Sequence, residues 1–92
     1  EAIGLCAPGR GMQALEEGWV MPGGKLPVNL SGGLKSKGHP VGATGVSMHV
    51  MAAWQLLGRW RSAPLPRARL AAILNMGGAG VANYGSVLER VS

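Results

Sequence analysis

The strongest hydrophobic pattern begins at Pro40 and ends at Leu57, just before Gly58. One set of apolar residues in it repeats at helical spacing: Val46, Val50, Ala53 and Leu57. Other apolar residues cover most of the remaining faces, which is typical of a buried helix. Proline is favoured at a first helical position and glycine after a last one, so both ends are marked. We expect a buried helix here, enclosed by more protein than 92 residues supply.

Two further apolar segments follow. Residues 68–75 contain a continuous apolar run at 70–74, which predicts a strand covered on both faces. Residues 81–91 predict a second strand, joined to the first by glycine-rich residues 76–80. Residues 12–17 favour a short helix, whereas 31–39 and 59–67 favour loops, the second of them basic. The predicted fold is α/β, with one buried helix and a C-terminal β-hairpin.

Composition narrows the function classes. A length of 92 residues leaves room for one domain at most. The single cysteine, Cys6, excludes a disulfide framework and a multi-cysteine metal site. A net charge of +5 favours an anionic partner. Without aromatic interleaving or a nucleic-acid motif, we expect a phosphorylated cofactor rather than nucleic acid.

The uncharged stretch 38–58 is interrupted by glycine, proline and histidine, so it predicts no membrane span. We expect a cytoplasmic protein. The chain starts at Glu1 without an initiator methionine, which suggests a processed chain or a piece of a longer one.

The first candidate site is His39, which a glycine-rich loop delivers to the start of the predicted helix. The spacing of the loop does not fit a Walker phosphate-binding motif. Helix N-termini carry partial positive charge, which favours a neutral imidazole and a nearby developing anion. His39 is therefore expected to donate to an oxyanion or to accept a thiol proton. The alternative is a structural histidine, which the glycines on both sides make less favoured.

The second candidate is the glycine-rich segment 75–80, whose N–H groups suit an oxyanion hole, although a plain hairpin turn explains it equally well. Three more side chains remain. We interpret Cys6 as a small apolar residue rather than a nucleophile. His49, about 80° from alignment with His39 on the helix, is expected to pack. Tyr84 is expected to pack too, with acid/base chemistry as the alternative.

Five segments carry a resemblance to a known family: Leu-Pro-Val-Asn at 26–29, Ser-Gly-Gly at 31–33, Lys-Gly-His-Pro-Val-Gly-Ala-Thr-Gly at 37–45, Gln-Leu at 55–56 and Asn-Met-Gly-Gly at 75–78. Together they are similar to the C-terminal end of a thiolase. The resemblance implies a fragment of the layered α/β/α/β/α thiolase fold. Residues 1–92 would form an incomplete C-terminal domain, and the nucleophilic cysteine would lie in the missing N-terminal half.

The same resemblance implies chemistry. Thiolases transfer acyl groups through an acyl-cysteine, with a coenzyme A thioester as substrate and no permanently bound cofactor. His39 matches the family histidine that helps bind the thioester oxygen, and Gly77 matches the glycine of a second oxyanion hole. The partners implied are acyl-CoA and the remaining thiolase domain or a second chain, in a homo-oligomer.

One departure leaves the reaction open. Asn75 stands where ordinary thiolases have an acid/base cysteine, and an amide exchanges no proton at neutral pH. In this the chain resembles the sterol-carrier-protein and lipid-transfer-like branch, some of whose members are acyl-CoA retro-aldolases. Tyr84 is the secondary acid/base candidate for such chemistry. Three hypotheses follow: an acyltransferase of the acetyl-CoA acetyltransferase type, a retro-aldolase or lyase, and an inactive truncated fragment.

Overall fold

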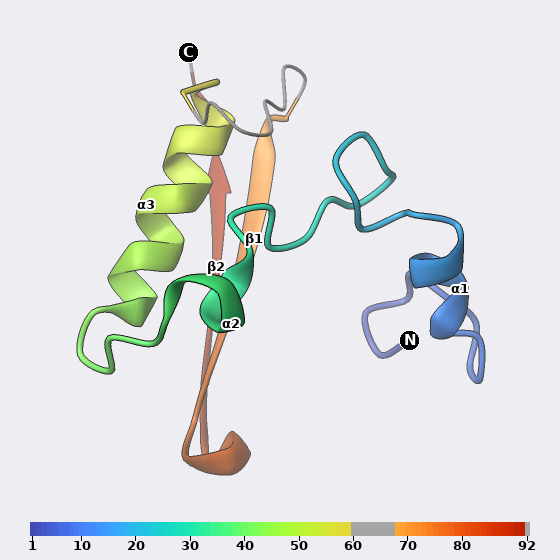
Figure 1. Ribbon diagram of the computed structural model, residues 1–92, viewed down its shortest axis with the longest axis horizontal. Helices are drawn as coiled ribbons and strands as arrows, with labels where there is room; N and C mark the ends of the chain where they lie inside the picture. Colours follow the sequence, from blue (N-terminus) through green and yellow to red (C-terminus); the bar gives the residue numbers. More distant parts are fainter. Residues whose placement is uncertain (60–67, 92) are drawn as a thin grey trace.

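A computed structural model describes residues 1–59 and 68–91 of the chain (Figure 1). Its elements are α1 (Met12–Glu16), α2 (Gly33–Lys37), α3 (Thr44–Leu56), β1 (Leu70–Gly77), the 3₁₀ turn η1 (Gly78–Gly80) and β2 (Ala82–Glu89). Helix α3 lies along the β1–β2 hairpin, whereas α1 and the N-terminal segment lie to one side. The predicted combination of one long helix and a C-terminal hairpin is confirmed. Of the predicted basic loop at 59–67, all but Arg59 lies outside the described residues.

The two strands pair antiparallel, from Leu70 opposite Glu89 to Gly77 opposite Ala82. The sequence placed the reversal over residues 76–80, but β1 continues through Gly77, so the turn is shifted toward β2. Three successive residues in the turn, at positions 78–80, have positive φ of 58°, 54° and 94°. Glycine supplies two of these three without the cost that a Cβ brings.

Residues 1–59 and 68–91 cover only one face of the hairpin. Ile73 faces α3 and is buried, with 8% of its surface exposed. On the opposite face Leu70, Leu74 and Val87 are 64–75% exposed. The expectation that the apolar β1 segment is covered on both faces is therefore not met by the described residues, because α3 lies on one side alone.

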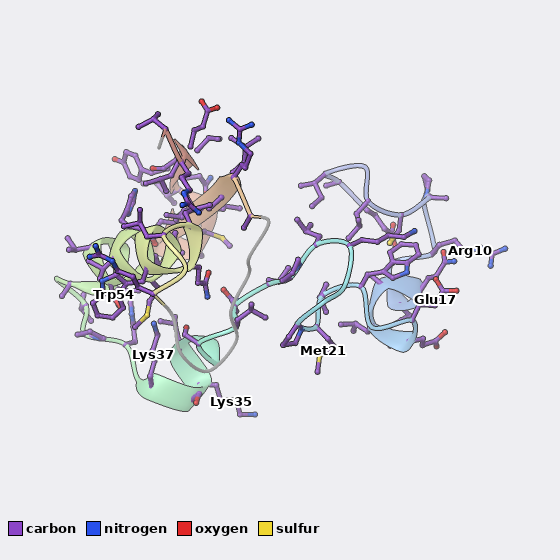
Figure 2. The ribbon with its side chains drawn as sticks, turned by 90° about the horizontal axis from the view of Figure 1, so that it is seen from above. Arg10, Glu17, Met21, Lys35, Lys37 and Trp54 are labelled. Carbon is purple, nitrogen blue, oxygen red and sulfur yellow. The ribbon has the colours of Figure 1, made fainter. Side chains whose placement is uncertain are left out.

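Helix α3 is half-covered rather than buried. Thr44, Ala52 and Leu56 are its buried residues. Trp54 lies on the side away from the strands and is 43% exposed (Figure 2). A two-stranded sheet is too narrow to enclose a helix, so the described residues cover one side of α3, and its full burial by more protein stays a prediction. The exposed apolar side fits the expectation that more protein belongs around this helix.

The helix begins four residues later than predicted. The Pro40 carbonyl already accepts the N–H groups of Ala43 and Thr44, at 2.8 and 2.9 Å. Ala43, however, has a φ of −127°, which is not helical, so the regular helix starts at Thr44. Residues 40–43 form a turn that leads the chain from α2 into α3.

Two contacts join α3 to β2 and to the residue that follows it, one through the Nε2 of His49 and one through Arg90. The Nδ1 of His49 donates to the Gly45 carbonyl at 2.6 Å, and its Nε2 lies 2.9 Å from the Ser86 hydroxyl. At the other end of the helix, Arg90 donates to the Leu56 carbonyl at 3.4 Å, where a positive charge also complements the helix dipole. His49 is half-buried and packs as the sequence predicted.

The sequence missed α2, which lies within the predicted loop at 31–39. Its five residues are too few for a hydrophobic period, and Gly32 and Gly38, with φ of 95° and 88°, bracket it. Lys37 extends toward α3, where its Nζ lies 3.5 Å from the Ser47 hydroxyl, whereas Lys35 extends away (Figure 2).

The short N-terminal helix is confirmed to within one residue. Before it, the N–H groups of Gly9 and Gly11 each donate to the Glu1 carboxylate at 3.0 Å, which lowers the pKa of Glu1. None of the helices in the described ranges has the length and apolar character that a membrane crossing requires.

Candidate active site

All four candidate residues named from the sequence line one pocket. His39, Asn75, Gly77 and Tyr84 surround a cavity of about 370 Å³, together with Val41, Thr44, Gly45, Met76 and Gly78. One wall is the bend before α3 and the first turn of that helix. The other is the end of the hairpin nearest the reversal, at the same end of the molecule as the helix start (Figure 1).

His39 lies on the bend between α2 and α3, as the sequence predicted. Its ring is exposed, but Nδ1 lies only 2.6 Å from the Thr44 hydroxyl oxygen. Thr44 is 5% exposed, and its hydroxyl donates to the Pro40 carbonyl at 3.0 Å. The imidazole is therefore anchored through one nitrogen to a buried side chain of the helix.

Asn75 and Tyr84 form a cross-strand pair on the helix-facing side of the hairpin. Asn75 is half-buried, and Tyr84 is 71% exposed near the reversal. A Cβ added to Gly45 would lie 2.9 Å from the Asn75 amide nitrogen. The glycine in the first turn of α3 thus leaves the space that the Asn75 amide occupies.

Gly77 stands in a different element than expected. The sequence placed it in the loop between strands, but it is the last residue of β1, opposite Ala82. It still lines the pocket, next to Gly78. Its role as an oxyanion donor stays a prediction.

Thr44 and Gly45 are site residues that the sequence did not single out. The available signal was the gathering of small and polar residues in the first turns of an otherwise apolar helix. Cys6, the only cysteine of the sequence, is buried elsewhere and does not line the pocket. The pocket thus combines a histidine, an amide and a phenol, without a thiol from this chain.

The space beside Gly45 gives a first test. Gly45→Ala should displace the Asn75 amide and, for a pocket that acts as an active site, lower the kcat/KM of its reaction about tenfold, the equivalent of one lost hydrogen bond. Stability should hold or rise by up to about 1 kcal/mol, because alanine favours the helix and the displaced group ends a movable side chain. Turnover and denaturant unfolding of the full-length protein that contains these residues would measure both.

The matched control is Gly42→Ala, because a Cβ there meets no atom within 4 Å. It should leave turnover and stability near their starting values. A Gly45→Ala protein that retains full turnover would show that the placement of Asn75 does not matter.

Comparison with known proteins adds a family to this geometry. Residues 1–90 match the family model described as thiolase C-terminal domain-like. Sterol carrier protein 2 of Bos taurus is 46% identical over 84% of the chain, and acetyl-CoA acetyltransferase of Methanothermobacter thermautotrophicus is 40% identical over 87%. Non-specific lipid-transfer protein-like 2 of Caenorhabditis elegans is 46% identical over 88%.

The aligned regions make up 14%, 21% and 20% of those three relatives, so the chain spans at most about a fifth of their length. No solved structure matches the chain.

Proposed function

The chain belongs to the thiolase C-terminal domain-like family, and on this premise we propose that its pocket is the histidine-bearing part of an acyl-CoA acyltransferase site. The convergence of His39, Asn75, Gly77 and Tyr84 on one pocket carries the proposal. His39 is more than thirty positions away from the other three in sequence. The fold must therefore bring the two segments together, whereas a chance cluster of loop residues would come from neighbouring positions.

In the proposed reaction, His39 accepts the proton of a cysteine thiol supplied from outside residues 1–92. The thiolate attacks the thioester carbonyl, and the carbonyl electrons move to oxygen. Backbone N–H groups near Gly77 and the protonated His39 stabilise that oxyanion. When it collapses, the coenzyme A thiolate leaves and takes the proton from His39. The product is an acyl-cysteine, ready for transfer to an acceptor.

Asn75 favours a second candidate, a retro-aldolase. The Asn75 amide exchanges no proton, but the phenol of Tyr84 lies directly across the hairpin. With a β-hydroxyacyl-CoA, a base would remove the hydroxyl proton and the Cα–Cβ bond would break. A carbonyl product would leave, and the electron pair would pass to the thioester enolate. Protonation of that enolate by Tyr84 would complete the reaction.

The net charge of the chain and its exposed apolar surface support the proposed partners. The net charge of +5 suits the phosphates of coenzyme A. The exposed apolar sides of α3 and of the hairpin suit coverage by the remaining thiolase domain or by a second copy. A homo-oligomer in the cytoplasm stays a prediction.

Trapping the intermediate tests the proposal. Brief incubation of the full-length protein with acetyl-CoA should add one acetyl group to a cysteine other than Cys6, as peptide mass spectrometry would show. Cys6→Ser should leave this adduct unchanged, because Cys6 does not line the pocket. A carbonyl product from a β-hydroxyacyl-CoA without any adduct would select the lyase. Neither product from the full-length protein would overturn both candidate reactions, whereas turnover by the isolated 92-residue chain would contradict the inactive fragment.

A further inference from the structure

We propose that Thr44 is a positioning residue that keeps the proton of the neutral His39 ring on Nδ1, so that Nε2 meets the substrate as a proton acceptor. This deepens the proposed function and rests on it for its chemical consequence. The two roles expected for His39, donor to an oxyanion and acceptor of a thiol proton, then follow one another in time.

The assignment follows from counting protons. The Thr44 hydroxyl has one proton, and the Pro40 carbonyl at 3.0 Å can only accept it. If Thr44 instead donated to a bare Nδ1, the Pro40 carbonyl would keep only its two backbone donors and the ring proton would sit on Nε2. With the hydroxyl proton directed at Pro40, the Thr44 oxygen has only lone pairs to offer to His39 Nδ1 at 2.6 Å. For that short contact to be a hydrogen bond, Nδ1 must carry the proton. In a neutral imidazole the other nitrogen is then bare.

The backbone holds this arrangement in place. The N–H groups of Ala43 and Thr44 both donate to the Pro40 carbonyl, which fixes that oxygen beneath the Thr44 side chain. Threonine is branched at Cβ, so its hydroxyl has few rotamers. Because Thr44 is also buried, the hydroxyl has no water to turn to. An exposed ring is thus oriented by a rigid partner only five residues away.

The second histidine provides an internal comparison. His49 Nδ1 also carries a proton, because it faces the Gly45 carbonyl, and its Nε2 is occupied by the Ser86 hydroxyl. In the described ranges, nothing hydrogen-bonds to Nε2 of His39, whose ring lines the pocket. The two rings therefore share a tautomer, but only His39 presents a bare nitrogen to a substrate.

This sets the order of the reaction. Nε2 first takes the thiol proton, so that the S–H bond breaks and an N–H bond forms on the ring. Only then does Nε2–H point at the oxyanion as a donor. The positive ring keeps its bond from Nδ1 to Thr44, which becomes a stronger, charge-assisted one. A ring with its resting proton on Nε2 would have to lose that proton before acting as a base.

Nitrogen NMR of the full-length protein, labelled with ¹⁵N in its histidine rings, tests the proposal directly. The His39 signals, assigned by their loss in His39→Gln, should show a protonated Nδ1 and a bare Nε2 in the neutral ring. Thr44→Val, which removes the hydroxyl and little else, should give a mixture of both tautomers. Thr44→Ser should restore the Nδ1–H form. The His49 signals should stay unchanged in both variants.

Kinetics complete the test. Thr44→Val should lower kcat/KM by about 10–100-fold, as losses of groups that orient an active imidazole do, and Thr44→Ser should recover most of it. A proton on Nε2 in the unmodified protein, or an unchanged tautomer in Thr44→Val, would overturn the inference. The tautomer of His39 in the unmodified protein is measured without relying on any variant to fold. The expected tautomers without any acyl-CoA turnover would support the Thr44 assignment and overturn the proposed function.

Discussion

Replacing His39 with alanine in the full-length protein should lower kcat/KM for acyl-CoA turnover by about 10²–10⁴-fold, the range of a lost general acid–base group. His39 is the histidine among the described residues that line the pocket, and the Asn75 amide cannot replace it as a proton acceptor. Steady-state turnover at saturating and limiting substrate would measure the loss.

His39→Asn separates chemistry from structure. The amide nitrogen of asparagine takes the place of Nδ1, so it should preserve the bond to Thr44 while removing Nε2. We expect a rate as low as that of His39→Ala, with a melting temperature closer to that of the unmodified protein. A near-normal rate in either variant would end the assignment of His39 to the reaction.

The second large effect concerns the uncovered side of α3. Val46 is 67% exposed in the described structure and lies near the start of the helix. If the rest of the thiolase chain covers this side, Val46→Asp places an unpaired carboxylate in an apolar contact and should lower the free energy of unfolding by about 3–5 kcal/mol. Denaturant unfolding and size-exclusion chromatography would follow stability and assembly together.

The sign of the change makes this experiment decisive. On an open helix surface, a carboxylate near the N-terminus would stabilise the helix by about 0.3–1 kcal/mol. A gain would therefore show that this side of α3 stays in water. Gln55→Glu is the comparison variant, because it adds a carboxylate at a polar position in the last turn of the same helix, where the dipole opposes it, and should lower stability by only about 0.3–1 kcal/mol.

The sequence carried the main elements because their patterns are long. The thirteen residues of α3 and the eight of each strand are long enough for an apolar segment to stand out between glycine-rich or polar stretches. Helix α2 has only five residues between two left-handed glycines, so its pattern is indistinguishable from a loop. The start of α3 was misplaced because Pro40 suits a first helical position, while the conformation of Ala43 delays the helix to Thr44.

The membership of the site was more predictable than its geometry. His39 and Tyr84 were named from residue type and surroundings, Asn75 and Gly77 from the family resemblance, and all four line the pocket. Their arrangement depends on strand register, which a reversal over residues 76–80 would have changed by setting Asn75 opposite Val81 instead of Tyr84. An error of this kind in the position of the hairpin turn shifts the strand register and so alters every cross-strand pair.

The contact between Thr44 and His39 was beyond sequence reasoning for another reason. A hydroxyl five residues after a histidine has no fixed direction until the backbone between them is known. Here the turn at 40–43 brings the two groups to 2.6 Å.

The pocket has two walls that belong to different parts of the chain, residues 39–45 and residues 75–84, and they meet only because α3 lies against the hairpin. Each wall keeps its own local bonds, so separating them would leave both recognisable and the site absent. Such a site forms or is lost in one cooperative event, in which both walls come together or separate. We expect a local opening of this kind to need less free energy than global unfolding, so the pocket should be lost on heating before the whole fold melts.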